Sequence, residues 1–362
     1  MKTFFLRHKK LHLWLTLDLL ALGLFYAIRG QREWMNVLSQ SFTAPMRRFI
    51  ASITYLTDVS VMEVLCVLLV LGIAVYLLWS IWAVIRAPGH RKDRFYSALL
   101  GGACFALSLW ASFCLLWGIN CWADGFQAKS GIYAQPVARE DLAIATIYFA
   151  QQLCNTADSV PRDESGAFAV PHEEILAQST HVYDAVEEQF PFLAFDDVGA
   201  KGVSFSRVMS YLDFTGIFCA FTAEANVNID APANRLGATV AHELAHQRGI
   251  FSEQECNFLG ILASTTSGIP AYEYAGWMSA FVYAGNALVS VEPELYWAIR
   301  AQLPPEVERD FAVSAAYWEQ FADKTPQKVS TTVYDGVLKA WGEELGIRSY
   351  GTVVDLLVTY YT

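Results

Sequence analysis

The chain has 362 residues, a formal net charge of −11, a hydrophobic content of 54% and a mean hydropathy of +0.29. This hydropathy is high for a soluble protein, and the length leaves room for more than one domain. Residues 1–123 hold 12 Lys and Arg against 5 Asp and Glu, whereas residues 124–362 hold 13 against 31. The basic residues flank apolar stretches instead of forming one basic face, which excludes a nucleic-acid-binding protein.

Three apolar stretches account for the basic front part of the chain. They cover residues 11–28, 62–85 and 97–123, and each is long enough to cross a hydrocarbon core about 30 Å thick. The first follows a basic tail, as a signal peptide does, but the next residues read RGQR and offer no small-residue cleavage site. We therefore predict that residues 1–123 form a membrane anchor of three transmembrane helices.

The basic residues also predict how the chain crosses the membrane. The N-terminal tail and the loop of residues 86–94 are basic, so both are expected in the cytoplasm. The loop of residues 29–61 then lies outside, although it carries four arginines of its own. Three crossings place residues 124–362 outside the cytoplasm, as the extracytoplasmic domain of a plasma-membrane protein. Asp18, within the first span, is expected near the membrane interface rather than in a contact between helices.

The acidic back part is mostly helical in pattern, with one extended stretch. Residues 217–229 read IFCAFTAEANVNI and are rich in β-forming side chains, which predicts a strand. Glu224, Asn226 and Asn228 alternate onto one face of it. Two interpretations of this face stay open, the wall of a substrate cleft and a strand face in contact with solvent.

The strongest signal follows at residues 242–246, which read HELAH and match the HExxH motif. Positions i and i+4 of a helix share a face, so His242 and His246 can reach one metal ion while Glu243 flanks the same site. Zinc at a catalytic site takes three protein ligands and leaves a fourth position for water. A third ligand is therefore expected nearby.

That ligand is expected on a second helix just after the motif. Gly249 suits a helix C-cap, and Ser252 with Glu255 fits a capping box. Glu253 then lies on the first turn, while Glu255 points about 200° away, so only one of them can face the zinc. We predict Glu253 as the ligand, with Glu255 as the alternative and otherwise a capping residue. Asn257 shares the face of Glu253 and is predicted to support a ligand by a hydrogen bond.

Such a centre assigns a chemical role to each residue. Zinc lowers the pKa of a bound water towards neutrality, and Glu243 would act as general base before delivering the proton to the leaving amine. The tetrahedral oxyanion needs a further donor. We select Tyr274, whose alternative role is aromatic packing, from a set of five eligible donors: Tyr272, Tyr274, His172, His181 and Arg248.

Three runs of this sequence resemble a known family. They read FTAEANVN at 221–228, AHELAHQRGIFSEQECNF at 241–258 and SYGTVVDLL at 349–357. They resemble a family of uncharacterised bacterial membrane proteins that pair N-terminal transmembrane helices with a domain of unknown function bearing HExxH. Members usually read S-E-x-E-A-N after the motif, whereas Cys256 replaces the Ala here. The resemblance implies a zinc metallopeptidase without an assigned substrate.

A wider resemblance concerns the fold. The order of Glu253 and Asn257 is similar to the E-x-x-A-D/N element of the gluzincins, the HExxH peptidases whose third ligand is Glu. In zinc peptidases of the thermolysin-like group, an edge strand beside the HExxH helix pairs with extended substrate. This resemblance implies a mainly α (α+β), zincin-like domain with a small edge-strand sheet over residues 124–362.

We therefore predict a membrane-anchored zinc metallopeptidase that acts on a peptide or protein substrate outside the cytoplasm. The alternative is a catalytically silent, zinc-stabilised membrane sensor that binds a peptide or a cell-wall component. The presence of Glu243 argues against this alternative, because a structural zinc site needs no general base. An intramembrane protease is disfavoured, since the motif's neighbourhood is too charged for lipid, with Arg235, Arg248 and Glu253 close by.

Overall fold

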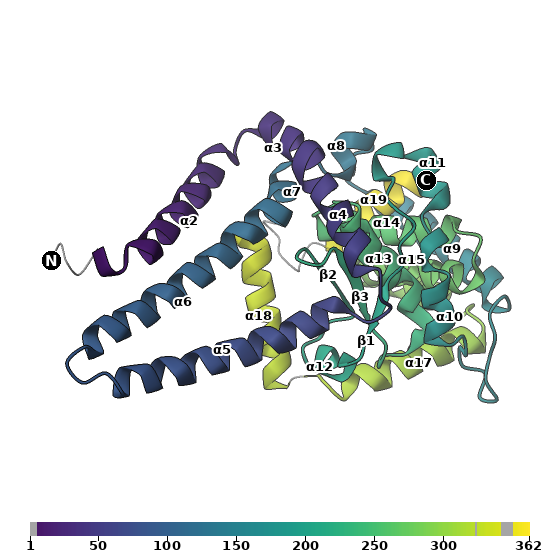
Figure 1. Ribbon diagram of the computed structural model, residues 1–362. Coiled ribbons are helices and arrows are strands. Elements are labelled where there is room, and N and C mark those ends of the chain that lie inside the picture. Colours follow the sequence, from purple (N-terminus) through teal and green to yellow (C-terminus); the bar gives the residue numbers. More distant parts are fainter. Residues whose placement is uncertain (1–5, 323, 342–349) are drawn as a thin grey trace. The chain divides into compact units, whose positions relative to one another are not determined.

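The computed structural model describes residues 6–322, 324–341 and 350–362, and it is mainly helical with a small three-stranded sheet (Figure 1). The chain divides into two compact units. Unit 1 comprises Met1–Arg47 and Val61–Ala123, and unit 2 comprises Arg48–Ser60 and Asp124–Thr362. The second unit therefore includes a segment that lies between the first two apolar stretches of the sequence.

Unit 1 contains the three long apolar helices expected from the sequence. Within the described residues, three helical stretches are long and apolar enough to cross a membrane: Lys9–Ile28, Val61–Ile85 and Arg91–Trp122. Their side chains are mostly exposed and apolar, as suits helices surrounded by lipid. The elements of the unit are α2 (Lys9–Ile28), α3 (Arg32–Leu38), the π-helical turn Ser39–Thr43, the start of α4 (Ala44–Thr54), α5 (Val61–Ile85), α6 (Arg91–Phe113), the π-helical turn Cys114–Gly118 and α7 (Ile119–Trp122).

Polar contacts join α2 to α6. The hydroxyl of Ser108 lies 2.9 and 3.0 Å from the two carboxylate oxygens of Asp18, and the indole N–H of Trp14 donates to the same hydroxyl at 2.7 Å. Asp18 thus contributes to a contact between helices, contrary to the expectation from sequence. Within an apolar span, such a partner stabilises a carboxylate.

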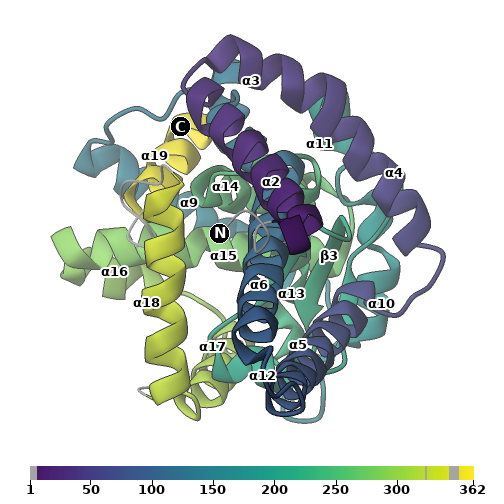
Figure 2. The same cartoon turned by 60° about the vertical axis from the view of Figure 1, so that its left-hand side comes forward.

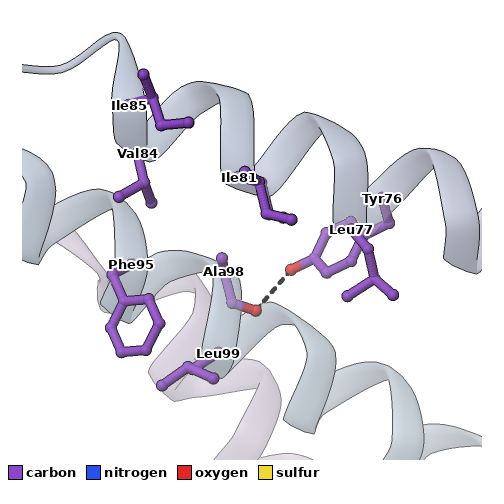
Figure 3. A pocket seen from close by; sticks show the side chains of 9 residues that line it. Tyr76, Leu77, Ile81, Val84, Ile85, Phe95, Ala98 and Leu99 are labelled. Carbon is purple, nitrogen blue, oxygen red and sulfur yellow. Dashed lines mark hydrogen bonds between the residues drawn. The ribbon is translucent and has the colours of Figure 1, made fainter.

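A second contact joins α5 to α6. The hydroxyl of Tyr76 donates to the carbonyl of Ala98 at 2.7 Å (Figure 3). Gly101 makes this approach possible, because a Cβ there would lie 2.6 Å from the Tyr76 oxygen. Beside this bond lies an apolar pocket of about 300 Å³, lined among others by Ile81, Phe95 and Leu99.

Unit 2 is built around a layer of packed helices. Five helices pack together and bury a continuous apolar core: α9, α13, α14, α15 and α19. Figure 2 shows three of them, α9, α14 and α15, side by side. Helix α13 contributes Val240 and Leu244 to this core, both fully buried. The helices are α8 (Phe126–Ser130), α9 (Arg139–Ala157), α10 (His172–Ala177), α11 (Asp184–Gln189), α12 (Ser206–Tyr211), α13 (Leu236–Gln247), α14 (Glu253–Thr266), α15 (Pro270–Val291), α16 (Pro293–Arg300), α17 (Pro305–Glu319), α18 (Thr325–Ala340) and α19 (Tyr350–Tyr361), with short 3₁₀ turns at Ser179–His181, Pro191–Leu193 and Ala233–Arg235.

The sheet lies against α13 (Figure 1). It contains β1 (Lys201–Val203), β2 (Gly216–Cys219) and β3 (Glu224–Asn228) in the order β1-β3-β2, with β1 parallel and β2 antiparallel to β3. The single strand predicted over residues 217–229 is therefore a hairpin, which turns at Ala223 with a φ of 54°. The edge strands are β1 and β2, and the polar residues expected on an edge strand lie on the central strand, β3.

Glu224, Asn226 and Asn228 are buried and line no open cleft. The ammonium of Lys201 on β1 lies 2.7 Å from Oε1 of Glu224. Ser60, from the segment Arg48–Ser60, donates to Oδ1 of Asn226 at 2.6 Å, and the amide of Asn228 donates to the Ser210 hydroxyl at 2.9 Å. Neither interpretation of this face holds, because other parts of unit 2 cover it and supply its hydrogen bonds.

Candidate metal centre

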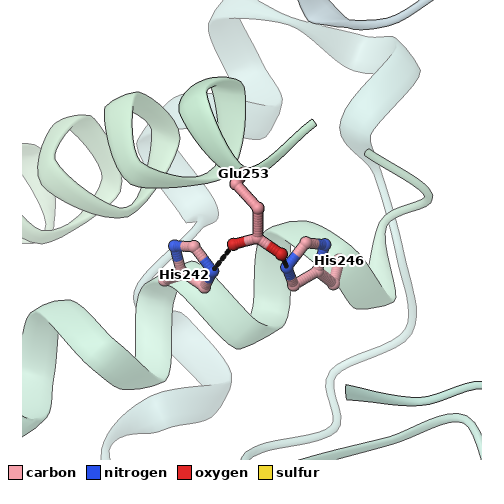
Figure 4. A group of neighbouring side chains, drawn as sticks. All are labelled: His242, His246 and Glu253. Atoms are coloured by element: carbon pink, nitrogen blue, oxygen red, sulfur yellow. Dashed lines mark ion pairs between the residues drawn. The ribbon is translucent and has the colours of Figure 1, made fainter. Parts of the chain in front are cut away.

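Two helices bring the predicted ligands together. His242 and His246 lie one turn apart on α13, and Glu253 is the first residue of α14. Nε2 of His242 is 3.2 Å from Oε2 of Glu253, and Nε2 of His246 is 3.4 Å from Oε1 (Figure 4). The three ligand atoms all lie within 4.8 Å of one another. This is the spacing of a site in which one small ion can contact all three side chains.

The turn between the helices explains this geometry. Gly249 has a φ of 92°, a left-handed conformation that ends α13 at the predicted position. Its amide donates to the carbonyl of His246 at 2.8 Å, and the amide of Ile250 donates to Ala245 at 3.2 Å. The chain therefore reverses within a few residues, which places the first turn of α14 beside the histidines.

The donor set fits zinc. Two imidazole nitrogens and one carboxylate oxygen are the ligands of a catalytic site with an open position. Nδ1 of His246 donates to the carbonyl of Ile250 at 2.9 Å, which orients the ring so that Nε2 faces Glu253. The buried Sγ of Cys256 lies 3.3 Å from the same Nδ1. Cys256 thus contacts the candidate ligand His246 on the Nδ1 side of its ring. Burial raises the pKa of the Cys256 thiol to about 12.

Opposite charges hold the cluster together. Burial opposes charge on both His246 and Glu253, but the contacts of His246 with Cys256 and Glu253, and those of Glu253 with the two histidines, outweigh it. The pKa of His246 is consequently raised well above its usual range, and the pKa of Glu253 is lowered well below it. A metal ion that takes the same ligands replaces the imidazole proton, so binding releases protons.

Glu243 lies between the two histidines and beside the edge strand. It is 5% exposed, and its Oε2 has no hydrogen-bond partner within the described part of the chain. Gly216 of β2 packs directly on this side chain, since a Cβ at that position would lie 2.4 Å from Oε1. Burial raises the pKa of Glu243, although the neighbouring histidines oppose this effect. The result is a buried carboxylate with a free oxygen and a raised affinity for protons.

A tyrosine that the sequence did not single out also reaches the centre. The hydroxyl of Tyr334 on α18 donates to Oε1 of Glu253 at 2.5 Å, and Phe214 packs edge-on against the Tyr334 ring. Burial, together with the charge of Glu253, raises the pKa of this hydroxyl, which therefore stays protonated as a donor. Tyr334 lies 81 positions after Glu253, so no local motif could have connected them.

Two other residues predicted near the centre, Glu255 and Asn257, behave differently from Glu253. The carboxylate of Glu255 accepts hydrogen bonds from the backbone amides of Phe126 at 2.7 Å and Gln127 at 3.0 Å. It thus satisfies the first turn of α8 and is not brought to the metal ligands. The predicted capping box is wrong, because the Ser252 side chain makes no capping hydrogen bond. Among the described residues, nothing hydrogen-bonds the side chain of Asn257, and its supporting role stays a prediction.

The eligible oxyanion donors are engaged elsewhere. The Tyr274 hydroxyl donates to the buried carboxylate of Asp310, and its ring stacks on Phe168. This is the packing role that the sequence left open for Tyr274. The remaining four contact groups outside the centre, namely Tyr272 with Ile175, His172 with Ala231, His181 with Asp184 and Arg248 with Glu187.

Comparison with known proteins gives a family but no function. No curated protein and no solved structure matches the chain. The family model described as "Protein of unknown function (DUF3810)" matches residues 38–358, which include the HExxH helix, Glu253 and the sheet. Two of the runs that carried the resemblance, 221–228 and 241–258, form β3 and the metal centre, while Ser349 of the third lies outside the described residues. The chain belongs to this family of proteins of unknown function.

Proposed function

We propose that unit 2 is a zincin-like metallopeptidase domain held at a membrane by the helices of unit 1. His242, His246 and Glu253 would hold zinc, which supplies a Lewis acid and an activated water when bound. The neutral imidazole nitrogens and the carboxylate fit this ion better than Mg²⁺ or Ca²⁺, which prefer oxygen ligands.

Glu243 carries the proposal. A structural zinc site has no use for a buried carboxylate between its ligands, whereas hydrolysis of a peptide bond needs a base there. The free Oε2 accepts the proton of the attacking water, and the raised pKa of Glu243 suits this step near neutral pH. The same carboxyl group then returns the proton to the leaving amine.

The edge strand supports a peptide as substrate. Because β2 lies at an edge of the sheet, an extended peptide could add to the sheet along this strand. Gly216 of this strand touches Glu243, so a peptide paired along β2 passes beside the general base. Ile217, 40% exposed, offers an apolar contact at the same place.

Tyr334 replaces Tyr274 as the donor for the oxyanion in this proposal. Its hydroxyl lies at the ligand carboxylate and stays protonated, and oxyanion donors have to lie within hydrogen-bond distance of the reacting carbonyl. The hydroxyl of Tyr274 donates instead to Asp310, which is not one of the candidate ligands.

The membrane arrangement completes the proposal. Three helices of unit 1 cross the lipid bilayer, with the N-terminus in the cytoplasm and Asp124–Thr362 outside, as the distribution of basic residues favours. Proteolysis of intact cells tests this orientation, since added protease would then reach Asp124–Thr362 and spare the loop of residues 86–94.

The experiment that tests the function compares Glu243→Gln with the wild-type full-length protein in detergent. Zinc content is measured by mass spectrometry and hydrolysis with a broad peptide library. We expect equal zinc content and at least about a hundredfold slower hydrolysis in Glu243→Gln. Glu319→Gln, an exposed change on α17, serves as the control. Full zinc occupancy in a wild-type protein that cleaves nothing would favour the zinc-stabilised sensor instead.

A further inference from the structure

Helix α4 has two faces of different character. Its inner face is buried in unit 2, where Ala51 is 1% exposed and clusters with Phe195 and Ala223. Its outer face carries Phe49 and Ile53, which are 62% and 53% exposed and share one face as positions i and i+4. Leu56, in the turn that follows the helix, is 83% exposed and extends this apolar stripe along the chain.

Hydrogen bonds to other parts of unit 2 hold α4 in place, so its exposed stripe does not reflect loose packing of the helix. The guanidinium of Arg48 donates to Asp196 at 2.6 Å and to the carbonyl of Ala194 at 2.5 Å. At the other end, the hydroxyl of Thr54 donates to the carbonyl of Thr222 at 2.8 Å, and Lys201 donates to the carbonyl of Thr54 at 2.8 Å. Both ends of the unit 2 part of α4 are thus fixed, with the apolar stripe facing outwards.

The position of this segment in the chain identifies what covers the stripe. Ser60, whose hydroxyl is bound to Asn226, directly precedes Val61, the first residue of the 25-residue helix α5. A helix of that length measures about 38 Å, more than the hydrocarbon core of about 30 Å, so Val61 lies in the headgroup region. Leu56 precedes Val61 by five residues, which span at most about 18 Å. The stripe therefore begins within reach of the lipid surface.

We propose that the apolar stripe formed by Phe49 and Ile53 on the outer face of α4, together with Leu56 in the turn after it, lies in the interface of the lipid bilayer. A helix with one apolar face lies in the plane of the membrane and inserts that face at the boundary of headgroups and acyl chains. Asp58 is the only acidic residue of the segment Arg48–Ser60, and it follows the stripe in the turn that leads to α5. Lipid is favoured over a protein partner because the segment continues directly into a membrane-spanning helix.

This contact would place the metal helix at the membrane surface. The hydroxyl of Tyr55, which follows α4, accepts a hydrogen bond from the Gln247 amide at 2.9 Å. Gln247 is fully buried, directly follows His246 and also donates to the carbonyl of Ala223 at 2.9 Å. The lipid-facing helix and the end of α13 are thus joined through one side chain. The inference concerns lipid contact alone and stands whether or not the centre is catalytic.

Photocrosslinking of the full-length protein tests the inference. Leu56→p-benzoylphenylalanine and, separately, Ile53→p-benzoylphenylalanine are reconstituted in vesicles of phosphatidylcholine and phosphatidylglycerol with a trace of alkyne-tagged phosphatidylcholine. The controls carry the same group at Ile144 and Val313, apolar positions of unit 2 that are 57% and 40% exposed. The group replaces an exposed side chain at every position, so each variant is expected to fold.

We expect lipid adducts at Leu56 and Ile53 in at least about tenfold greater yield than at the two controls. Equal yields at all four positions would overturn the inference. Adducts at Leu56 or Ile53 with protein in place of lipid would also overturn it and would identify the stripe as a protein interface.

Discussion

Replacing Gly216 by alanine tests Glu243, the proposed general base, independently of the candidate metal ligands. The added Cβ would lie 2.4 Å from Oε1 and 2.6 Å from Cγ of Glu243. Ordinary van der Waals contact begins at 3.4 Å, so the Glu243 side chain has to withdraw by about 1 Å. Because the clash includes Cγ, rotation of the carboxylate alone does not relieve it. The three atoms nearest to the added Cβ all belong to Glu243, so the candidate metal ligands are expected to keep their positions.

The size of the effect follows from the displacement. Misplacing a catalytic group by about 1 Å costs up to about a hundredfold in rate, equivalent to about 2.7 kcal/mol of the activation barrier. We expect Gly216→Ala to lower kcat by this factor on any peptide that the wild type cleaves, with zinc content unchanged. Glu319→Gln is again the control, since this side chain is exposed at the end of α17 and has no part in the proposed site.

A double mutant gives the decisive comparison. If Gly216→Ala acts through Glu243, it changes nothing further in a Glu243→Gln background, because the base is already lost. A further loss of similar size in that background would show that Gly216 acts on another part of the site. Unchanged kcat in the single mutant would refute the role assigned to Glu243 itself.

Two further predictions concern the ligands. Glu253→Gln should remove most of the zinc affinity, measured by competition with a chelator, whereas Glu255→Gln should leave zinc affinity intact and lower the free energy of unfolding by about 1–2 kcal/mol through the loss of its bonds to α8. Tyr334→Phe should weaken zinc binding by about tenfold or more, because such outer partners of a metal ligand tune its affinity. Equal affinity in wild type and Tyr334→Phe would show that the hydrogen bond from Tyr334 to Glu253 does not support zinc binding.

The local part of the centre was predictable from the sequence. His242, His246 and Glu253 lie within 12 consecutive residues, and helical periodicity with one glycine stop fixes their relation. Gly216 and Tyr334 reach the same centre from distant parts of the chain. Nothing in their own surroundings marks them, because a glycine in a short strand and a tyrosine on a surface helix are common features. Only the tertiary contacts assign them to the site.

The sheet shows a different limit. Alternation correctly placed Glu224, Asn226 and Asn228 on one face, but the pattern of polar residues is the same whether water or another segment covers that face. The covering segment, Arg48–Ser60, comes from between two apolar stretches, where a simple loop was expected. The prediction of a capping box was wrong for a related reason. The Glu255 carboxylate accepts hydrogen bonds from backbone amides of α8, a helix that is distant in the sequence.

The covering segment leads to a last prediction, which concerns the fragment Asp124–Thr362. Without Arg48–Ser60, the buried Lys201 loses two of its acceptors, the carbonyls of Thr54 and Val59 at 2.8 and 3.1 Å. Each buried polar group left without a partner costs about 1–3 kcal/mol, and the apolar contacts of Ala51 are lost as well. A loss of about 3 kcal/mol lowers the Tm of a domain of this size by about 6–12 °C.

A synthetic peptide of residues 48–60 tests this cause directly. Bound to the excised fragment in excess, it should raise the Tm and slow proteolysis of the sheet, whereas a scrambled peptide should do neither. If the fragment resists protease as well as the full chain does, and if the peptide does not change its Tm, the segment Arg48–Ser60 contributes nothing to the stability of the sheet. Stabilisation by the peptide would instead mean that the fold of unit 2 is completed by the segment that leads into α5.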